Sequence, residues 1–335
     1  MSDVPEIDIR PFAAGGHEAR KIAEALDAAC RQIGFFAVVG HGVDPALQDR
    51  LDVLARQFFA QSETEKEEIA MARAGSAWRG WFPLGGELTD GIPDRKEGLY
   101  FGADLGPDHP RVRAGTPMHG ENLYPREPKE LRPVVRTYMS LMTNVGQTVL
   151  SGIALGLGLD RSWFAENLTT DPLTLFRIFR YPATTGTGTG QWGVGEHTDY
   201  GLLTLLGQDQ WGGLQVKTAK GWVDALPRAG RLICNIGDML ERLTGGRYRS
   251  TPHRVVNTGR GDRLSFPFFL DPSWDAEVER LPIVERPVDD DGARRWDHTS
   301  VHGFNGTYGD YITAKVGKVF PDLAVRSGVD EEDGL

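Results

Sequence analysis

The spacing of the apolar residues changes near the middle of the chain, and this change limits the folds that the chain can adopt. Apolar residues recur at helical spacing in residues 19–33, 44–60 and 128–157. From residue 173 to residue 269 the sequence is instead divided into short apolar runs separated by glycine-containing turns, which is typical of strands. Helices followed by many short strands favour a mainly β core with helical additions.

A short polar motif, His197-Thr198-Asp199, lies among the expected strands, and His253 follows in a later one. Residues two apart on a strand point to the same face, so His197 and Asp199 can present an imidazole nitrogen and a carboxylate oxygen to one point. With His253 they form a set of three ligands. Two neutral imidazoles and one carboxylate suit divalent iron and leave coordination positions free for a co-substrate and O2. The tripeptide alone also fits a strand histidine bonded to a carboxylate.

Arg263 and Ser265 lie ten or more positions after His253 and share one face of an expected strand. Their neighbours are apolar, so an inward-facing Arg263 needs an anionic partner. A planar guanidinium beside a hydroxyl fits a carboxylate, such as the distal carboxylate of 2-oxoglutarate. The alternative interpretation is an arginine at the rim of the core, in a surface salt bridge.

The order of these motifs resembles that of the iron(II)- and 2-oxoglutarate-dependent dioxygenases related to isopenicillin N synthase. The similarity extends to residues 34–43 and 180–182, and residues 86–94 and 197–201 look most like the branch that contains the bacterial ethylene-forming enzyme. The resemblance implies a double-stranded β-helix, or jelly roll, backed by helices. It also implies a non-haem oxygenase that uses Fe(II), 2-oxoglutarate and O2, with ascorbate supporting activity in vitro.

The resemblance also assigns residues to the site. The metal ligands would be His197, Asp199 and His253, and the 2-oxoglutarate site would comprise Arg263, Ser265 and Tyr181. The substrate site would comprise Arg177, Glu87, Thr89, Tyr200, Phe269 and Lys318. Packing between strands is an alternative for Tyr181 and Arg177, and capping of a loop is one for Glu87. Lys318 stands where the ethylene-forming enzyme has arginine, and an ammonium does not reproduce the guanidinium fork.

The expected reaction oxidises a small-molecule metabolite while 2-oxoglutarate goes to succinate and CO2. Hydroxylation is the main expectation, with desaturation or cyclisation as variants. The alternatives are an oxidase of the isopenicillin N synthase type that consumes no 2-oxoglutarate, an ethylene-forming enzyme, and a non-catalytic small-molecule binding or sensor protein. A zinc hydrolase is disfavoured because no general base is marked and the Arg263-x-Ser265 element would have no role.

Composition sets the remaining expectations. The net charge of −10 disfavours nucleic acid or an anionic membrane as a partner. Two cysteines give no disulfide framework, and no apolar signal core or bilayer-spanning run is seen, so a cytoplasmic location is expected. We expect one catalytic domain over residues 1–335: a helix-rich part (1–170), a core with the metal site (171–275) and an extension with a closing helix (276–335).

Overall fold

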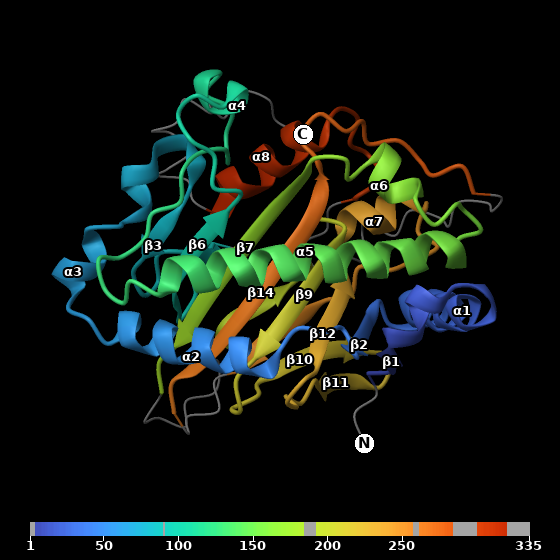
Figure 1. The fold of residues 1–335 in the computed structure, drawn as a ribbon, viewed down its shortest axis with the longest axis horizontal. Helices are drawn as coiled ribbons and strands as arrows, with labels where there is room; N and C mark the ends of the chain where they lie inside the picture. The colour runs from blue at the N-terminus through green and yellow to red at the C-terminus, as the bar shows by residue number, and fades with distance from the viewer. Residues whose placement is uncertain (1–3, 90, 184–191, 257–260, 284–299, 320–335) are drawn as a thin grey trace.

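The computed structural model describes residues 4–89, 91–183, 192–256, 261–283 and 300–319 (Figure 1). Two sheets form its centre. The larger one has eight strands in the order β1 (Glu6–Asp8), β2 (Phe35–Val39), β12 (Leu232–Ile236), β9 (Leu203–Gln208), β14 (Arg263–Ser273), β7 (Pro172–Tyr181), β6 (Glu97–Gly102) and β3 (Gly80–Phe82). The smaller one has four strands in the order β11 (Gly221–Asp224), β10 (Leu214–Thr218), β13 (His253–Val256) and β8 (Trp192–His197). A separate hairpin joins β4 (Leu88–Thr89) to β5 (Ile92–Pro93).

Strand pairing brings distant parts of the sequence together. Except for the parallel pair β1 and β2, the strands in the two main sheets pair antiparallel. The register places Arg263 opposite Tyr181 and His253 opposite His197. The two sheets with their helical covering are the jelly roll that the resemblance implied.

Helices cover the outer face of the larger sheet. The long helix α5 (Leu131–Gly156) crosses in front of β7, β14 and β9, and α2 (Pro45–Phe59) runs beside it (Figure 1). A Cβ at Gly146 would lie 2.7 Å from Cδ2 of Leu270, so glycine allows α5 to approach β14 closely. The remaining helices are α1 (Gly16–Gln32), α3 (Glu63–Glu67), α4 (Pro110–Arg113), α6 (Trp163–Asn167), α7 (Asp238–Leu243), α8 (Tyr308–Val319) and the 3-10 turns Arg10–Ala14 and Met71–Ala77. Among the described residues, no helix has the length and apolar character needed to cross a membrane.

The expected helices and strands are present, with small shifts at their ends. Helix α2 begins at Pro45, and the side chain of Asp44 accepts a hydrogen bond from the Ala46 amide as its N-cap. In the charged segment 63–68 the side chain of Lys66 is buried and pairs with Glu97 at 2.8 Å. One local expectation was wrong. Asp199 does not lie on a strand with His197, because β8 ends at His197 and Asp199 lies in the following turn.

Candidate metal centre and substrate pocket

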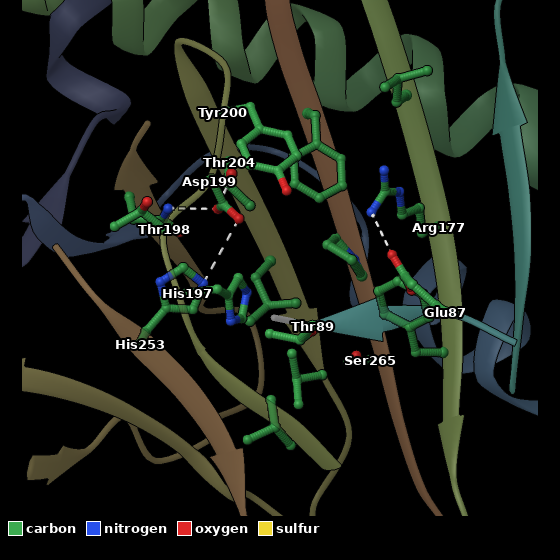
Figure 2. A pocket seen from close by; sticks show the side chains of 18 of the residues that line it. Glu87, Thr89, Arg177, His197, Thr198, Asp199, Tyr200, Thr204, His253 and Ser265 are labelled. Atoms are coloured by element: carbon green, nitrogen blue, oxygen red, sulfur yellow. Dashed lines mark hydrogen bonds and ion pairs between the residues drawn. The ribbon is translucent and has the colours of Figure 1, made fainter. Parts of the chain in front are cut away.

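Three side chains in the smaller sheet and the adjoining turn present a set of metal-ligating atoms. His197 is the last residue of β8, His253 is the first of β13, and Asp199 lies in the turn between β8 and β9. One ligand atom from each residue lies within 4.8 Å of the other two. Nε2 of His253 is 3.7 Å from Oδ1 of Asp199 (Figure 2). The three ligands come from one side, which suits an ion with further positions open to small ligands.

Hydrogen bonds orient each of these side chains. Nδ1 of His197 is 2.9 Å from the Gly195 carbonyl oxygen, and Nδ1 of His253 is 3.2 Å from the Thr251 carbonyl oxygen. An Nδ1–H that donates to a carbonyl fixes the tautomer and leaves Nε2 as the free donor atom for a metal.

The carboxylate of Asp199 is held by two groups of the larger sheet. Its Oδ2 accepts hydrogen bonds from Oγ1 of Thr204 at 2.5 Å and from Nδ2 of Asn235 at 2.7 Å. Thr204 and Asn235 lie opposite each other on β9 and β12. These bonds occupy one carboxylate oxygen and leave Oδ1 facing the histidines.

The electrostatics of the cluster favour the protonation states that bind a metal. Burial, followed by the neighbouring His253, lowers the pKa of His197 to about 3, so its imidazole is neutral at pH 7. Burial alone would raise the pKa of Asp199, but the two histidines and the bonds from Asn235 and Thr204 hold it below its ordinary value. A neutral imidazole and a carboxylate can both bind a cation without first losing a proton.

The metal-ligating cluster opens into a cavity of about 450 Å³ between the two sheets. Alternate residues of β14 line this cavity: Arg263, Ser265, Pro267, Phe269 and Asp271. Alternate residues of β7 do the same from the neighbouring strand: Leu175, Arg177, Phe179 and Tyr181. The alternation follows from the strand period of two, so one face of each strand builds the pocket.

Arg263 lies deep in this cavity and keeps part of its hydrogen-bonding capacity free. Its side chain is buried, its Nε donates to the Gly212 carbonyl at 2.5 Å, and its guanidinium carbon lies 4.8 Å from the centre of the Tyr181 ring. Its Nη1 is buried and has no hydrogen-bond partner among the described residues. A buried guanidinium with an unsatisfied N–H group is suited to an anionic ligand.

A second charged group lies across the pocket from the metal-ligating cluster (Figure 2). Glu87 is buried there, with its Oε2 at 2.8 Å from Nζ of Lys96 and its Oε1 accepting from the Tyr100 hydroxyl at 2.7 Å. Arg177 completes the group, with Nη1 at 3.6 Å from Oε1 of Glu87. Burial alone would raise the pKa of Glu87, but Lys96 and Arg177 outweigh it and lower that pKa.

The structure brings nearly all the residues expected from the sequence into one cavity. The lining includes Glu87, Thr89, Arg177, Tyr181, His197, Asp199, Tyr200, His253, Arg263, Ser265 and Phe269. Lys318 belongs to α8, but its side chain lies outside the described part of the structure. Lys315, one turn earlier in α8, lines the pocket and lies with Nζ 5.5 Å from the centre of the Tyr200 ring.

Several lining residues were not found by reading the sequence: Lys96, Thr204, Asn235, Asp271 and Lys315. Two of them carried a usable signal. Asn235 interrupts the apolar strand Leu232–Ile236, and a buried amide requires a partner. Asp271 continues the alternation that begins at Arg263. The other three are ordinary residues whose positions follow from tertiary contacts.

Two family descriptions match the chain over much of its length. Residues 4–127 match the non-haem dioxygenase in morphine synthesis N-terminal family, and residues 172–272 match the 2OG-Fe(II) oxygenase superfamily. The second match spans β7 to β14 and includes both candidate ligand histidines and Arg263.

Similar proteins extend this relationship over almost the whole chain. A probable iron/ascorbate oxidoreductase of Dictyostelium discoideum is 45% identical, covering 96% of each chain. A homoarginine-6-hydroxylase of Glycine max is 34% identical, covering 96% of this chain and 99% of its own length. A full-length Neurospora crassa protein, whose crystal structure is a complex with alpha-KG, is 26% identical with a TM-score of 0.78, covering 94% of this chain and 96% of its own. The chain belongs to the 2OG-Fe(II) oxygenase superfamily and is a dioxygenase that uses Fe(II), 2-oxoglutarate and O2.

Proposed function

We propose that His197, Asp199 and His253 are the protein ligands of Fe(II). The observation that supports this assignment is the convergence of two imidazole nitrogens and one carboxylate oxygen within 4.8 Å. Two nitrogens and one oxygen suit ferrous iron, and the bonds at both Nδ1 atoms and at Oδ2 of Asp199 aim the remaining atoms at one point. When bound, iron together with 2-oxoglutarate and O2 supplies the oxidising power.

The same proposal assigns the distal carboxylate of 2-oxoglutarate to Arg263 and Ser265, with Tyr181 beside them. The free Nη1 of Arg263 is a donor suited to a carboxylate, and Ser265 lines the cavity from the same face of β14. The Tyr181 ring supports the guanidinium from the adjacent strand. These residues bind and orient the co-substrate and exclude water from it.

The charged wall of the pocket indicates the class of substrate. Glu87, Thr89, Arg177, Tyr200 and Phe269 line the cavity, and Lys315 adds a cation from α8. Both signs of charge are present, so the pocket complements a small molecule that carries a carboxylate and a cationic group. The named activity of the homoarginine-6-hydroxylase relative supports an amino acid or a closely similar metabolite. Lys318 is a further candidate for this wall, on the resemblance alone.

Hydroxylation is the proposed outcome. One substrate C–H bond becomes C–OH with one oxygen atom from O2, while the other oxygen atom enters succinate as 2-oxoglutarate loses CO2. Ethylene is expected to be absent or a minor product, because by the resemblance Lys318 stands where the ethylene-forming enzyme has arginine, and an ammonium does not reproduce a guanidinium.

The deciding assay incubates purified protein with Fe(II), ascorbate, O2 and 2-oxoglutarate, with and without arginine, homoarginine and other amino acids. Succinate, hydroxylated product and headspace ethylene are measured together, with His253→Ala as the inactive control. Without an amino acid we expect slow succinate formation. When the substrate is present, succinate formation should rise, and the added succinate should equal the hydroxylated product. Product without succinate would instead indicate an oxidase of the isopenicillin N synthase type, and dominant ethylene would overturn the hydroxylase proposal.

We also propose a single catalytic domain over residues 1–335 and a cytoplasmic location. The pocket is built by residues from Phe35 to Val316, which supports one domain. Cys30 and Cys234 are both free and buried, which supports a reducing compartment.

A further inference from the structure

We propose that Asp209 is a positioning residue for Arg263, and that Arg56 holds Asp209 in place from helix α2. This inference rests on the proposed function, in which Arg263 binds the distal carboxylate of 2-oxoglutarate. Asp209 does not line the cavity. It would act only through the conformation of the arginine.

Asp209 ties the start of β14 to the turn that follows β9. Its side chain is 3% exposed. Oδ2 accepts a hydrogen bond of 2.6 Å from the amide of Leu264, the residue after Arg263. Oδ1 accepts one of 3.0 Å from the amide of Trp211. One buried carboxylate therefore satisfies two backbone N–H groups that belong to different segments.

The turn held by Asp209 supplies the carbonyl that orients the guanidinium. One residue after Trp211, the Gly212 carbonyl accepts the Nε–H of Arg263 at 2.5 Å. Gly212 and Gly213 have φ values of 70° and 99°, which favour glycine, so this turn has a specific backbone shape. Asp209 thus fixes both the backbone on which Arg263 stands and the acceptor that fixes its side chain.

Arg56 connects this arrangement to the helical layer. Its Nη2 donates to Oδ2 of Asp209 at 3.0 Å, and its Nη1 donates to the Asp262 carbonyl at 2.9 Å. Within α2 its Nε donates to Asp52 at 2.7 Å, which holds the guanidinium in one orientation. The residues on both sides of Arg263 are therefore bound, directly or through Asp209, to one arginine of α2.

Arg263 needs this support because it is the first residue of β14. Strand ends open more readily than strand centres, and a guanidinium that moves must be ordered again whenever the co-substrate binds. Bonds at Asp262, Leu264 and Gly212 remove much of that freedom before binding. Loss of the Asp209 carboxylate should therefore weaken the binding of the distal carboxylate of 2-oxoglutarate by Arg263, while the metal ligands stay in place.

The test measures 2-oxoglutarate binding to the Mn(II)-loaded full chain without O2, by calorimetry. We expect Asp209→Ala to raise the dissociation constant about tenfold and Arg56→Ala to raise it less, with Mn(II) affinity within about twofold of the unchanged protein. In turnover assays the KM for 2-oxoglutarate should rise while kcat at saturating 2-oxoglutarate changes little. Asp209→Asn retains one acceptor oxygen, so its dissociation constant for 2-oxoglutarate should lie between those of Asp209→Ala and the unchanged protein.

Asp27→Ala is the matched control. Like Asp209, Asp27 accepts hydrogen bonds from arginine side chains, in its case Arg31 and Arg247, and it also accepts one from the Tyr248 hydroxyl. Asp27 lies outside the pocket lining. It should lower the thermal midpoint without changing 2-oxoglutarate affinity. If Asp27→Ala weakened 2-oxoglutarate binding as much as Asp209→Ala does, the cause would be a general loss of stability and the inference would be wrong.

A double-mutant cycle separates this inference from the proposed function. If Asp209 acts through Arg263, adding Asp209→Ala to Arg263→Ala should raise the dissociation constant for 2-oxoglutarate little further. Normal binding by Arg263→Ala alone would refute the anchor itself. Weak binding by Arg263→Ala with normal binding by Asp209→Ala would refute only the positioning role, as would fully additive effects.

Discussion

Asn235 donates a hydrogen bond of 2.7 Å from its Nδ2 to Oδ2 of Asp199, across 36 residues of sequence. The bond joins β12 of the larger sheet to the turn that carries Asp199, the carboxylate of the candidate metal centre. Because Thr204 donates to the same oxygen, the rotamer of Asp199 is set by the larger sheet, while both histidines belong to the smaller one. The metal centre therefore depends on how the two sheets face each other.

Asn235→Ala should weaken metal binding about 10- to 100-fold, as expected when a group that orients a ligand is lost. Fe(II) or Mn(II) affinity, measured by anaerobic titration, checks this. Asn122→Ala is the control, since Asn122 is another buried amide, bonded to the backbone of Gly102. Unchanged affinity in Asn235→Ala would show that Thr204 alone orients Asp199.

Arg263→Ala should weaken the binding of 2-oxoglutarate by about 2 to 5 kcal/mol, because it removes the charge-assisted pair with the distal carboxylate of the co-substrate. Metal affinity should persist. Arg263→Lys should recover only part of the loss, since an ammonium lacks the planar fork. Calorimetry on the Mn(II)-loaded variants distinguishes these results. Intact 2-oxoglutarate binding with loss of amino-acid turnover alone would favour the oxidase alternative.

Lys96→Met should destabilise the fold by about 3 to 5 kcal/mol, because it removes the nearest cation of two buried carboxylates. Lys96 lies 2.8 Å from Glu87 and 2.7 Å from Asp94, and all three are buried. Urea unfolding gives the free energy. Lys217→Met, which removes the exposed pair with Glu196, should cost less than about 1 kcal/mol. Equal losses of unfolding free energy in Lys96→Met and Lys217→Met would contradict the expectation that burial makes the Lys96 pairs more important for stability.

Asp271→Asn should stabilise the metal-free protein at pH 8 and have little effect near pH 4. Burial is the main cause that raises the pKa of Asp271 from 3.8 to about 7. The folded state therefore holds this proton when the unfolded chain has lost it, so the group lowers stability as pH rises from about 4 to 7. The expected gain at pH 8 is roughly 2 to 4 kcal/mol, since the amide oxygen can still accept from the Leu202 amide.

Urea unfolding of both proteins at pH 4.5 and pH 8 measures the difference. Asp275→Asn is a control of opposite sign, because the hydrogen bond from Arg111 lowers the pKa of that exposed carboxyl. A variant at Asp271 that was destabilised equally at both pH values would show that the carboxylate is held ionised in the folded protein.

The chemistry of the site could be predicted from the sequence because its signals are local. Pairs such as Arg263 and Ser265 lie two apart on one strand, and the strand period of two sends both into the cavity. The same period places Arg177 and Tyr181 on the pocket face of β7. Helix ends followed from cap residues such as Asp44. The family resemblance joined these local signals into one site, which periodicity alone does not do.

The tertiary structure decided which groups support those residues. Asn235 reaches Asp199, Lys96 reaches Glu87, and Asp209 reaches Leu264 through pairings between strands and loops that no local pattern records. The turn that carries Asp199 and the burial of Lys66 were also decided at this level. Periodicity reports only which face a side chain takes, whereas hydrogen-bond partners depend on sheet register and on the packing of segments far apart in the sequence.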